Sequence, residues 1–255
     1  HGGAGAGPER LANVERAVAI AAGILDSGGS AIEAAVEACV VLEDDPVFNA
    51  GTGSVFRTDG SVHLDASIQT SKGKMGFVIG MQDTPNPIRV AADLLDEDIN
   101  GLSGDGARLW ADSKGFEKSN VQGRPPFKGA TDTVGVVARD KSGLIVCATS
   151  TGGTSKRPPG RVGDVPLPGC GFWVQDGVGV GATGIGEAIT RGMISLRVAD
   201  RILDGNGLEE SMMWALEECL EEDAEVGIIA LGAEGTGHGV SNSTNMPWAS
   251  WIARK

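Results

Sequence analysis

The sequence predicts an α+β fold in which mainly antiparallel sheets are covered by helices. Short apolar segments rich in β-branched residues are joined by turn sequences such as Asp59-Gly60, which are typical of hairpins. Longer segments with apolar residues at helical spacing stand before and after groups of these strands. A parallel sheet would instead show a regular alternation of strand and helix.

The first part of the chain predicts a loop and two helices. The opening from His1 to Gly7 is rich in glycine and has too little side chain to pack. The first helix, Pro8 to Asp26, has proline in its first turn and Gly28-Gly29 after its end. The second helix begins at Ser30, whose hydroxyl suits an N-cap because Glu33 stands three residues later. Both helices are expected to cover a sheet.

The middle of the chain is expected to form an antiparallel meander and two short helices. The predicted strands are Ser54 to Thr58, Val62 to Gln69 and Met75 to Met81, and the predicted helices are Pro87 to Asp96 and Gly104 to Lys114. A polar stretch from Lys118 to Ala130 contains Pro125-Pro126. It is predicted to be exposed and open to cleavage.

The second half predicts two pairs of strands, two helices and a last strand. The strands are Val134 to Arg139, Leu144 to Thr149, Phe172 to Gln175, Val178 to Ala182 and Val226 to Leu231. The helices are Gly186 to Leu203 and Leu208 to Glu221.

The composition indicates a globular protein with an acidic surface. Of its 255 residues 41% are hydrophobic, which is enough for a substantial core. The net charge of −13 argues against nucleic acid as a partner, because binding phosphates requires a basic surface. No apolar run reaches the roughly 20 residues of a membrane span, so no membrane partner is expected. No signal or transit peptide is visible, which favours the cytoplasm.

Thr133 is the candidate nucleophile, since it stands at the start of an apolar, β-branched run. If the bond before it were cut, the residue would carry a hydroxyl and a free α-amine. Such an amine has an unperturbed pKa of about 7.7 to 8.0, so it can act as a base at neutral pH. The alternative is an ordinary buried residue at the head of a strand.

The three histidines give little support to other catalytic centres. A serine or cysteine triad requires a histidine that a carboxylate orients. His63 lies in a predicted strand beside Asp65, His238 lies in a glycine-rich turn, and His1 lies in the opening loop. Metal binding by such scattered histidines is equally weakly supported.

The segment Gly179 to Gly184 matches the G-x-G-x-x-G pattern of dinucleotide-binding loops, and Asp204 stands roughly 20 residues after it. In that fold the acidic residue ends a second parallel strand, whereas Asp204 ends a predicted helix. Nucleotide binding is therefore the weaker interpretation. A glycine-rich loop before a helix still suits an anion or a carboxamide.

Arg161 and Asp164 are charged residues among small neighbours. One interpretation is that they pair with each other on the surface. The other is a clamp for a zwitterion, in which Arg161 binds an α-carboxylate and Asp164 accepts from an α-ammonium. The two interpretations predict different kinetics for variants.

Several segments together resemble the Ntn-hydrolases of the plant-type L-asparaginase and isoaspartyl peptidase family, which are related to glycosylasparaginase and the threonine aspartase. The resemblance covers nearly the whole chain and keeps the family's order of motifs. The matching segments are His1 to Gly5, Phe48 to Gly53, Leu64 to Ser67, Asp132 to Gly135, Thr149 to Gly153, Gly160 to Asp164 and Thr183 to Glu187. The resemblance implies an αββα sandwich of two stacked sheets flanked by helices.

The resemblance also implies a role for each matching residue. Thr133 corresponds to a nucleophile that is freed when the precursor cleaves itself after Asp132. The other positions correspond to the hydrogen-bond partner of the nucleophile (Thr151), the clamp on the substrate (Arg161 and Asp164), the oxyanion hole (Thr183 and Gly184) and a further substrate-binding position (Gly186).

Other segments are implied to support processing and stability. Asn49 resembles an asparagine near the cleavage site, and the loop with Gly2 and Gly3 resembles one that supports processing. The loop from Leu42 through Glu43 to Phe48 resembles one that binds a structural sodium ion through backbone carbonyls. No cofactor is expected for catalysis. Residues 1–132 and 133–255 are expected to be the α and β chains of one domain, and two such pairs are expected to form a homodimer.

Three departures from the family pattern bear on these expectations. Family members have a short apolar strand before the histidine-glycine loop, so such a strand is expected ahead of His1. Asp132 stands where the asparaginase branch more often has glycine, and the segment Gly169 to Trp173 is similar to the threonine aspartase. The ending, Ser241 to Trp251, differs from the usual C-terminal strand.

We expect an autoprocessed hydrolase of L-asparagine and β-aspartyl dipeptides that acts through an aspartyl ester on Thr133. An intact Arg161 and Asp164 favour such small substrates, because the clamp binds a free α-carboxylate and α-ammonium. The alternatives are a glycosylasparaginase-like or threonine-aspartase-like hydrolase, and an unprocessed precursor that acts as a binding protein.

Overall fold

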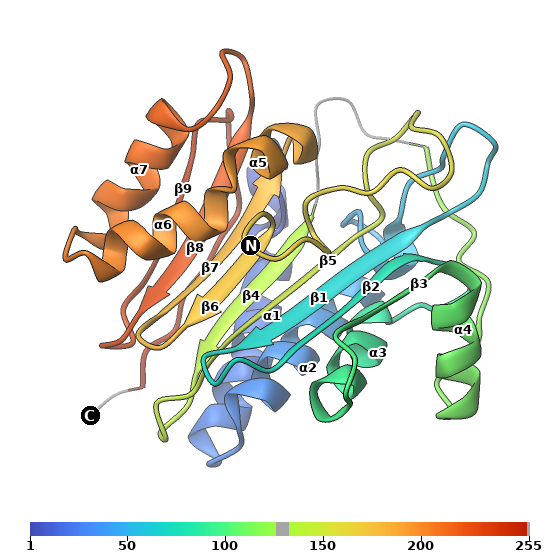
Figure 1. The fold of residues 1–255 in the computed structure, drawn as a ribbon, viewed down its shortest axis with the longest axis horizontal. Helices are drawn as coiled ribbons and strands as arrows, with labels where there is room; N and C mark the ends of the chain where they lie inside the picture. The colour runs from blue at the N-terminus through green and yellow to red at the C-terminus, as the bar shows by residue number, and fades with distance from the viewer. Residues whose placement is uncertain (126–132, 254–255) are drawn as a thin grey trace.

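The computed structural model describes residues 1–125 and 133–253, which form two stacked β-sheets between two layers of helices (Figure 1). The five-stranded sheet has the order β3-β2-β1-β5-β4 and the four-stranded sheet the order β6-β7-β8-β9. All neighbouring strands are antiparallel except β2 and β3. The predicted α+β sandwich of mainly antiparallel sheets is therefore confirmed.

The strands of the two sheets come from different parts of the chain. The five-stranded sheet contains β1 (Leu64–Thr70), β2 (Met75–Met81), β3 (Gly101–Ser103), β4 (Val134–Arg139) and β5 (Ile145–Thr151). The four-stranded sheet contains β6 (Phe172–Gln175), β7 (Val178–Gly184), β8 (Val226–Gly232) and β9 (Gly237–Ser241). The five-stranded sheet thus combines segments from both sides of Thr133.

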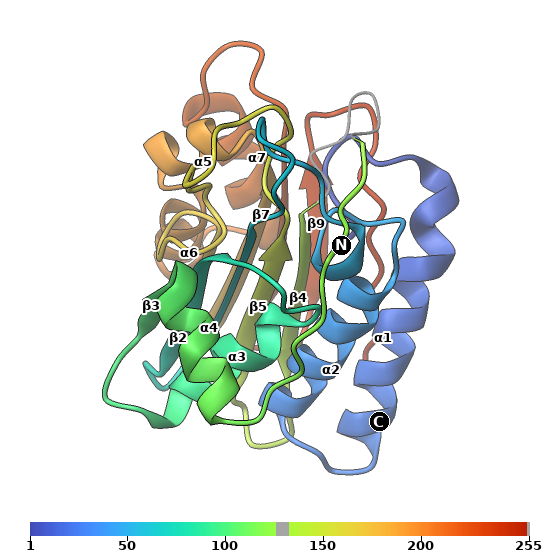
Figure 2. The ribbon, with the colours of Figure 1, turned by 90° about the vertical axis from the view of Figure 1, so that its right-hand side faces the viewer.

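Each sheet has its own layer of helices on its outer face (Figure 2). The five-stranded sheet is covered by α2 (Ala31–Asp44), α3 (Pro87–Asp93) and α4 (Gly104–Ser113), and α1 (Leu11–Asp26) packs against α2. The four-stranded sheet is covered by α6 (Ile194–Leu203) and α7 (Leu208–Glu218), and α5 (Gly186–Gly192) follows β7. Ser30 caps α2 as predicted, because its hydroxyl accepts a hydrogen bond from the amide of Glu33.

The two sheets lie close together because β7 carries glycines on the face that meets the other sheet. A Cβ atom at Gly179 would lie 2.8 Å from Ile145 and from Val137. A Cβ atom at Gly181 would lie 3.3 Å from the sulfur of Cys147. These glycines are thus packing residues inside a strand, and the dinucleotide interpretation of Gly179 to Gly184 is wrong.

Two predicted elements differ from the structure. The segment Ser54 to Thr58 is not a regular strand, since it forms a single bridge between Val55 and Arg124 before it turns back at Gly60. The expected helix from Gly186 to Leu203 is divided into α5 and α6. Met193 divides it by adopting a left-handed conformation with φ 45°.

Several strand ends also differ from the expectation. Strand β5 extends two residues further, to Thr151, and β7 extends to Gly184. Strands β3 and β9 are not predicted at all. After β9 the chain has no regular secondary structure from residue 242 to residue 253. Among the described residues, none of the helices is long and apolar enough to cross a membrane.

Candidate active site

Thr133 lies directly before β4, where the ends of β5 and β7 also meet. Val134 pairs with Ser150 in the sheet, so Thr133 comes opposite the end of β5 that carries Thr151. The hydroxyl of Thr133 donates a hydrogen bond of 3.1 Å to the hydroxyl of Thr151. Thr133 is only 6% exposed, so its hydroxyl is held in a largely dry environment.

The hydroxyl of Thr151 is held by the turn that follows it. It accepts a hydrogen bond of 3.0 Å from the amide of Gly153. Asn49 in turn fixes this turn, because its side-chain amide donates to the carbonyl of Gly153 and its side-chain oxygen accepts from the amide of Val55. Asn49 therefore helps to position Thr151, the hydrogen-bond partner of the candidate nucleophile.

Thr183 and Gly184 are the last two residues of β7. The hydroxyl of Thr183 is fully buried and lies 3.5 Å from the carbonyl oxygen of Thr133. Gly184 has φ 138°, and a Cβ atom there would collide with the carbonyl oxygen of Glu225. Only glycine fits this position, directly after the buried Thr183.

The predicted clamp residues lie together, but Arg161 has an unpredicted partner. The guanidinium of Arg161 donates two hydrogen bonds to Glu187, from Nε to Oε1 at 3.1 Å and from Nη2 to Oε2 at 2.8 Å. Such a two-point contact fixes the plane of the guanidinium. A simple surface pair of Arg161 with Asp164 is not observed, since Asp164 is only 5% exposed and Arg161 binds Glu187.

Gly186 connects the clamp to the end of β7. A Cβ atom at Gly186 would lie 2.7 Å from Oδ1 of Asp164 and 2.8 Å from Nη2 of Arg161. Gly186 is two residues from Gly184, so the two charges lie beside the predicted oxyanion hole. The glycine leaves room for a ligand between both side chains.

Burial governs the ionisation of Asp164. Burial raises the pKa of Asp164 from its ordinary 3.8 to about 7, while the nearby Arg161 lowers it and the carboxylates of Asp65 and Glu187 raise it. Oδ2 of Asp164 has no hydrogen-bond partner among the described residues. A buried oxygen without a partner suits the acceptance of a donor such as an ammonium group.

Asp65 and Arg57 are two further buried charged residues close enough to influence each other electrostatically, and neither is predicted to be a site residue. Asp65 lies opposite Thr151 in the pairing of β1 with β5. Burial raises the pKa of Asp65 to about 6, against the opposing effects of the Gly80 amide, Arg57 and Arg161. The motif Leu64 to Ser67 and the final glutamate of Thr183 to Glu187 are the sequence signals that mark Asp65 and Glu187.

The histidines do not form a catalytic triad with Thr133. His63 was expected within a strand but lies just before β1. Its Nε2 lies 2.9 Å from the side-chain nitrogen of Gln82. His238 contacts Trp248 and lies 3.6 Å from Glu209. Among the described residues, no imidazole nitrogen lies within hydrogen-bond distance of the Thr133 hydroxyl, and no group of His, Cys, Asp or Glu suits a metal ion.

The residues expected in a sodium loop lie at the end of α2 and after it. Leu42 and Glu43 belong to α2, which ends at Asp44, so they are not in a loop. The carbonyl oxygens of Glu43 and Pro85 would lie 2.6 Å and 2.5 Å from a Cβ atom at Gly51. The carbonyl oxygens of Phe48 and Pro46 lie similarly close to Gly53. Converging backbone carbonyls are the hard oxygen donors that suit such a cation.

The opening loop packs against the site from the side of β4. His1 pairs with Gly135 through two backbone hydrogen bonds, of 2.8 Å and 3.3 Å. Gly2 packs directly on the ring of Phe48, and Gly3 adopts φ 104°. Asp132 lies outside the described residues, so its predicted role in processing remains a prediction.

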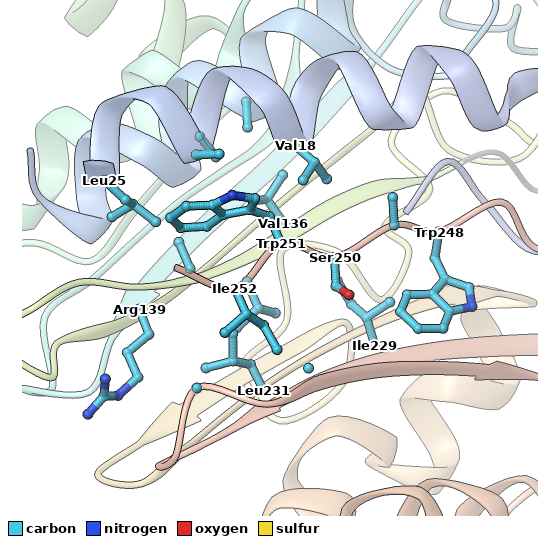
Figure 3. A pocket seen from close by; sticks show the side chains of 18 of the residues that line it. Val18, Leu25, Val136, Arg139, Ile229, Leu231, Trp248, Ser250, Trp251 and Ile252 are labelled. Carbon is cyan, nitrogen blue, oxygen red and sulfur yellow. The ribbon is translucent and has the colours of Figure 1, made fainter. Parts of the chain in front are cut away.

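An apolar cavity of about 330 Å³ lies between α1, β4 and β8 (Figure 3). Its walls include Val18 of α1, Val136 of β4 and Ile229 of β8, together with Trp248 and Trp251 of the C-terminal segment. None of the predicted catalytic or substrate-binding residues lines it. The cavity is therefore separate from the candidate active site.

Comparison with known proteins agrees with this geometry. The chain is 37% identical to the plant-type L-asparaginase of Pyrobaculum calidifontis, over 85% of this chain and 83% of that protein. It is 36% identical to the isoaspartyl peptidase/L-asparaginases of Macaca fascicularis and Homo sapiens, over 98% of this chain and 91% of each relative. A family model described as asparaginase matches residues 1–124 and 121–255. The chain therefore belongs to this asparaginase family.

Proposed function

We propose that this protein is an amidohydrolase that cleaves the side-chain amide of L-asparagine and the isopeptide bond of β-aspartyl dipeptides. The observation that carries this proposal is the position of the Thr133 hydroxyl, 3.1 Å from Thr151 and beside the end of β7. The relatives' names support the substrate class. Arg161 and Asp164 support it too, because Arg161 can bind the free α-carboxylate of an aspartyl group and Asp164 can bind its α-ammonium.

The reaction follows from the chemistry of these groups. The α-amine of a freed Thr133 takes the hydroxyl proton, and Oγ1 attacks the β-carbonyl carbon of the substrate. Thr183 and the amide of Gly184 donate to the oxyanion that develops. The intermediate collapses to an aspartyl ester as ammonia, or the amine of the second residue, leaves with the proton. Water then opens the ester and releases aspartate.

The free α-amine requires a cut before Thr133. In our proposal the hydroxyl of Thr133 attacks the carbonyl of Asp132, and water opens the resulting ester. Residues 1–132 and 133–255 then remain as two chains of one domain. Their contributions to the same five-stranded sheet support this proposal, because β1 stays paired with β5.

Three accessory features complete the proposal. The backbone carbonyls of Glu43, Pro46 and Phe48, in the segment from Leu42 to Phe48, would hold a structural sodium ion that stiffens the turn bearing Asn49. Two processed pairs would associate as a homodimer. A cytoplasmic location agrees with a small-molecule substrate. None of these features takes part in the chemical step.

The central test replaces Thr133 with alanine. Thr133→Ala is expected to lose self-cleavage and hydrolysis, whereas Thr133→Ser keeps a hydroxyl and should retain both at lower rates. Denaturing electrophoresis and ammonia release report the two activities. Retention of either activity in Thr133→Ala would remove the proposed mechanism. A band of 26.1 kDa that persists in the unmodified protein would favour the binding-protein alternative.

The choice among related substrates needs a separate comparison. Turnover of L-asparagine, β-aspartyl-leucine and a glycosylated asparagine should be measured with the same mature preparation. We expect the first two to be hydrolysed and the third to be poor. A dominant activity on the glycosylated substrate would instead favour a glycosylasparaginase-like enzyme.

A further inference from the structure

The glycine-rich loop at the start of the chain contacts the predicted oxyanion hole through the amide of Ala4. The amide of Ala4 donates a hydrogen bond of 3.3 Å to the hydroxyl oxygen of Thr183. A backbone amide can only donate, so the Thr183 hydroxyl must accept at this contact and direct its own hydrogen elsewhere. The Thr183 hydroxyl donates its own hydrogen to the carbonyl oxygen of Thr133 at 3.5 Å, so the amide of Ala4 helps to orient the hydroxyl toward the reacting residue.

This loop has few side chains with which to hold its own shape. Gly3 and Gly5, on both sides of Ala4, adopt φ values of 104° and 77°. Glycine backbones lose the most conformational freedom on folding, so such a loop needs support from outside. The support comes from the irregular segment after β9.

That segment binds the loop on both sides of Ala4. The amide of Gly2 donates to the carbonyl of Pro247 at 3.0 Å. The amide of Gly5 donates to the carbonyl of Asn245 at 2.8 Å and to the hydroxyl of Ser243 at 3.0 Å. These contacts fix the amide of Gly5, the residue that follows Ala4.

The side chain of Asn245 adds a further contact with the loop. Its Nδ2 donates a hydrogen bond of 2.7 Å to the carbonyl of Ala6. Gly5 binds the backbone of Asn245 and Ala6 binds its side chain, so two separate hydrogen bonds hold the loop against this residue. Ser243 connects the segment internally, since its hydroxyl donates to the carbonyl of Asn245 at 3.0 Å.

The same segment is anchored to the strand that neighbours Thr183. Ser241 donates to the carbonyl of Val226 at 3.0 Å, and its hydroxyl lies 2.6 Å from that of Ser243. The buried sulfur of Met246 packs on Gly227, which pairs with Thr183 between β7 and β8. The segment therefore touches both the strand partner of Thr183 and the loop that binds its hydroxyl.

We propose that Ser243 and Asn245 are positioning residues for the hydrolytic reaction, acting through the Ala4 amide on the hydroxyl of Thr183. This inference rests on the proposed function, in which Thr183 donates to the oxyanion. Substrate binding belongs to Arg161 and Asp164, which these residues do not contact. Their loss should therefore affect kcat and leave KM nearly unchanged.

The test compares Asn245→Asp with Thr244→Ala in the mature enzyme. Asn245→Asp has the same shape but places an acceptor against the carbonyl of Ala6, while Thr244 is an exposed neighbour in the same segment. For L-asparagine, kcat per cleaved chain is expected to fall about tenfold in Asn245→Asp, with KM within about twofold. Thr244→Ala should match the unmodified enzyme.

A second variant keeps the test decisive if Asn245→Asp fails to mature. Ser243→Ala removes one acceptor of the Gly5 amide and should lower kcat by about twofold to threefold with KM unchanged.

The results separate this inference from the proposed function. If the unmodified protein hydrolyses neither L-asparagine nor β-aspartyl-leucine, the proposed function itself fails. If it is active and neither Asn245→Asp nor Ser243→Ala lowers kcat per cleaved chain, the positioning role is refuted. A loss of kcat that is matched by a rise of KM would equally refute it, because the clamp would then be disturbed.

Discussion

The carboxyl of Asp164 lies buried beside Arg161, with one oxygen that has no partner among the described residues. Only its ionised form offers a full negative charge to an α-ammonium. Burial opposes that ionisation and raises the pKa of Asp164 to about 7, above the opposing effect of Arg161. Substrate binding therefore requires the ionised carboxyl of Asp164, whereas burial favours the neutral one. The first effect can be measured by kinetics and the second by unfolding.

The first prediction concerns the pH dependence of catalysis. Because Asp164 is neutral below its pKa of about 7, kcat/KM for L-asparagine should rise as the pH increases through about 7. Asp164→Asn should lose the part of this rise that Asp164 causes and keep the part that deprotonation of the Thr133 α-amine causes at about pH 7.7 to 8.0. It should also lower kcat/KM by about 10- to 100-fold, since a hydrogen bond between charged groups is removed. Steady-state kinetics between pH 5 and pH 9 would check this, and an unchanged profile in Asp164→Asn would contradict it.

The second prediction concerns stability. The pKa of Asp164 is raised on folding from 3.8 to about 7, so its contribution to stability is complete below pH 3.8 and is lost as the pH rises through about 7. Asparagine carries no charge at any pH. Asp164→Asn should therefore be more stable above pH 7 by up to about 4 kcal/mol, with the difference vanishing near pH 4. Urea unfolding at both pH values measures it, and a difference that grew toward low pH would contradict it.

The third prediction concerns the partner of Arg161. Glu187→Gln weakens the two-point contact that holds the guanidinium, so KM for L-asparagine should rise about tenfold while kcat changes little. Glu210→Gln breaks a surface ion pair between Glu210 of α7 and Arg201 of α6 and serves as the matched control. If both variants had the same KM for L-asparagine, the contact of Glu187 with Arg161 would have no role in substrate binding.

At the scale of elements, the junction of β7 with α5 connects the oxyanion hole to the clamp. Strand β7 ends with Thr183 and Gly184, and α5 starts at Gly186, which lies against the side chains of Arg161 and Asp164. The oxyanion hole and the residues that contact the clamp therefore follow each other within one short segment. The left-handed Met193 ends α5 after two turns and lets α6 take another direction. The sheet thus fixes one end of this segment and a short helix the other.

The fourth prediction tests that junction. Gly186→Ala places a methyl group 2.7 Å from Asp164 and 2.8 Å from Arg161. Both contacts are with side-chain ends, and the backbone of Gly186 does not require glycine. The variant should fold with little change in melting temperature, while KM for L-asparagine rises at least about tenfold. An unchanged KM would show that the ligand does not pass between these charges.

Local signals predict most elements but not all of their ends. The capping of α2 by Ser30 and the hairpin turns depend on neighbouring residues, and the sequence therefore reveals them. Strand β3 depends on pairing with β2, and β9 on pairing with β8, so neither has a strong signal of its own. The break at Met193 is similar, because methionine is an unusual residue for a left-handed conformation.

At the scale of the whole molecule, the site is assembled from segments that are distant in sequence. Motif resemblance predicts Thr133, Thr151 and Thr183 as parts of one site, and the structure brings them together. The contact of Arg161 with Glu187 spans 26 residues, and the support of the opening loop by Asn245 spans 239. Such partners follow from the tertiary fold and have no local pattern.

The mixed origin of the five-stranded sheet has a consequence for how the enzyme recovers from denaturation. Strands β1 and β5 lie on opposite sides of Thr133 and pair from Asp65 with Thr151 to Thr70 with Val146. While the chain is continuous, this pairing is intramolecular, and a cut before Thr133 turns it into an encounter of two separate polypeptides. Refolding of the mature enzyme from urea should therefore slow down on dilution, whereas Thr133→Ala should refold at a rate independent of concentration. Maturation would thus make the refolding rate depend on protein concentration.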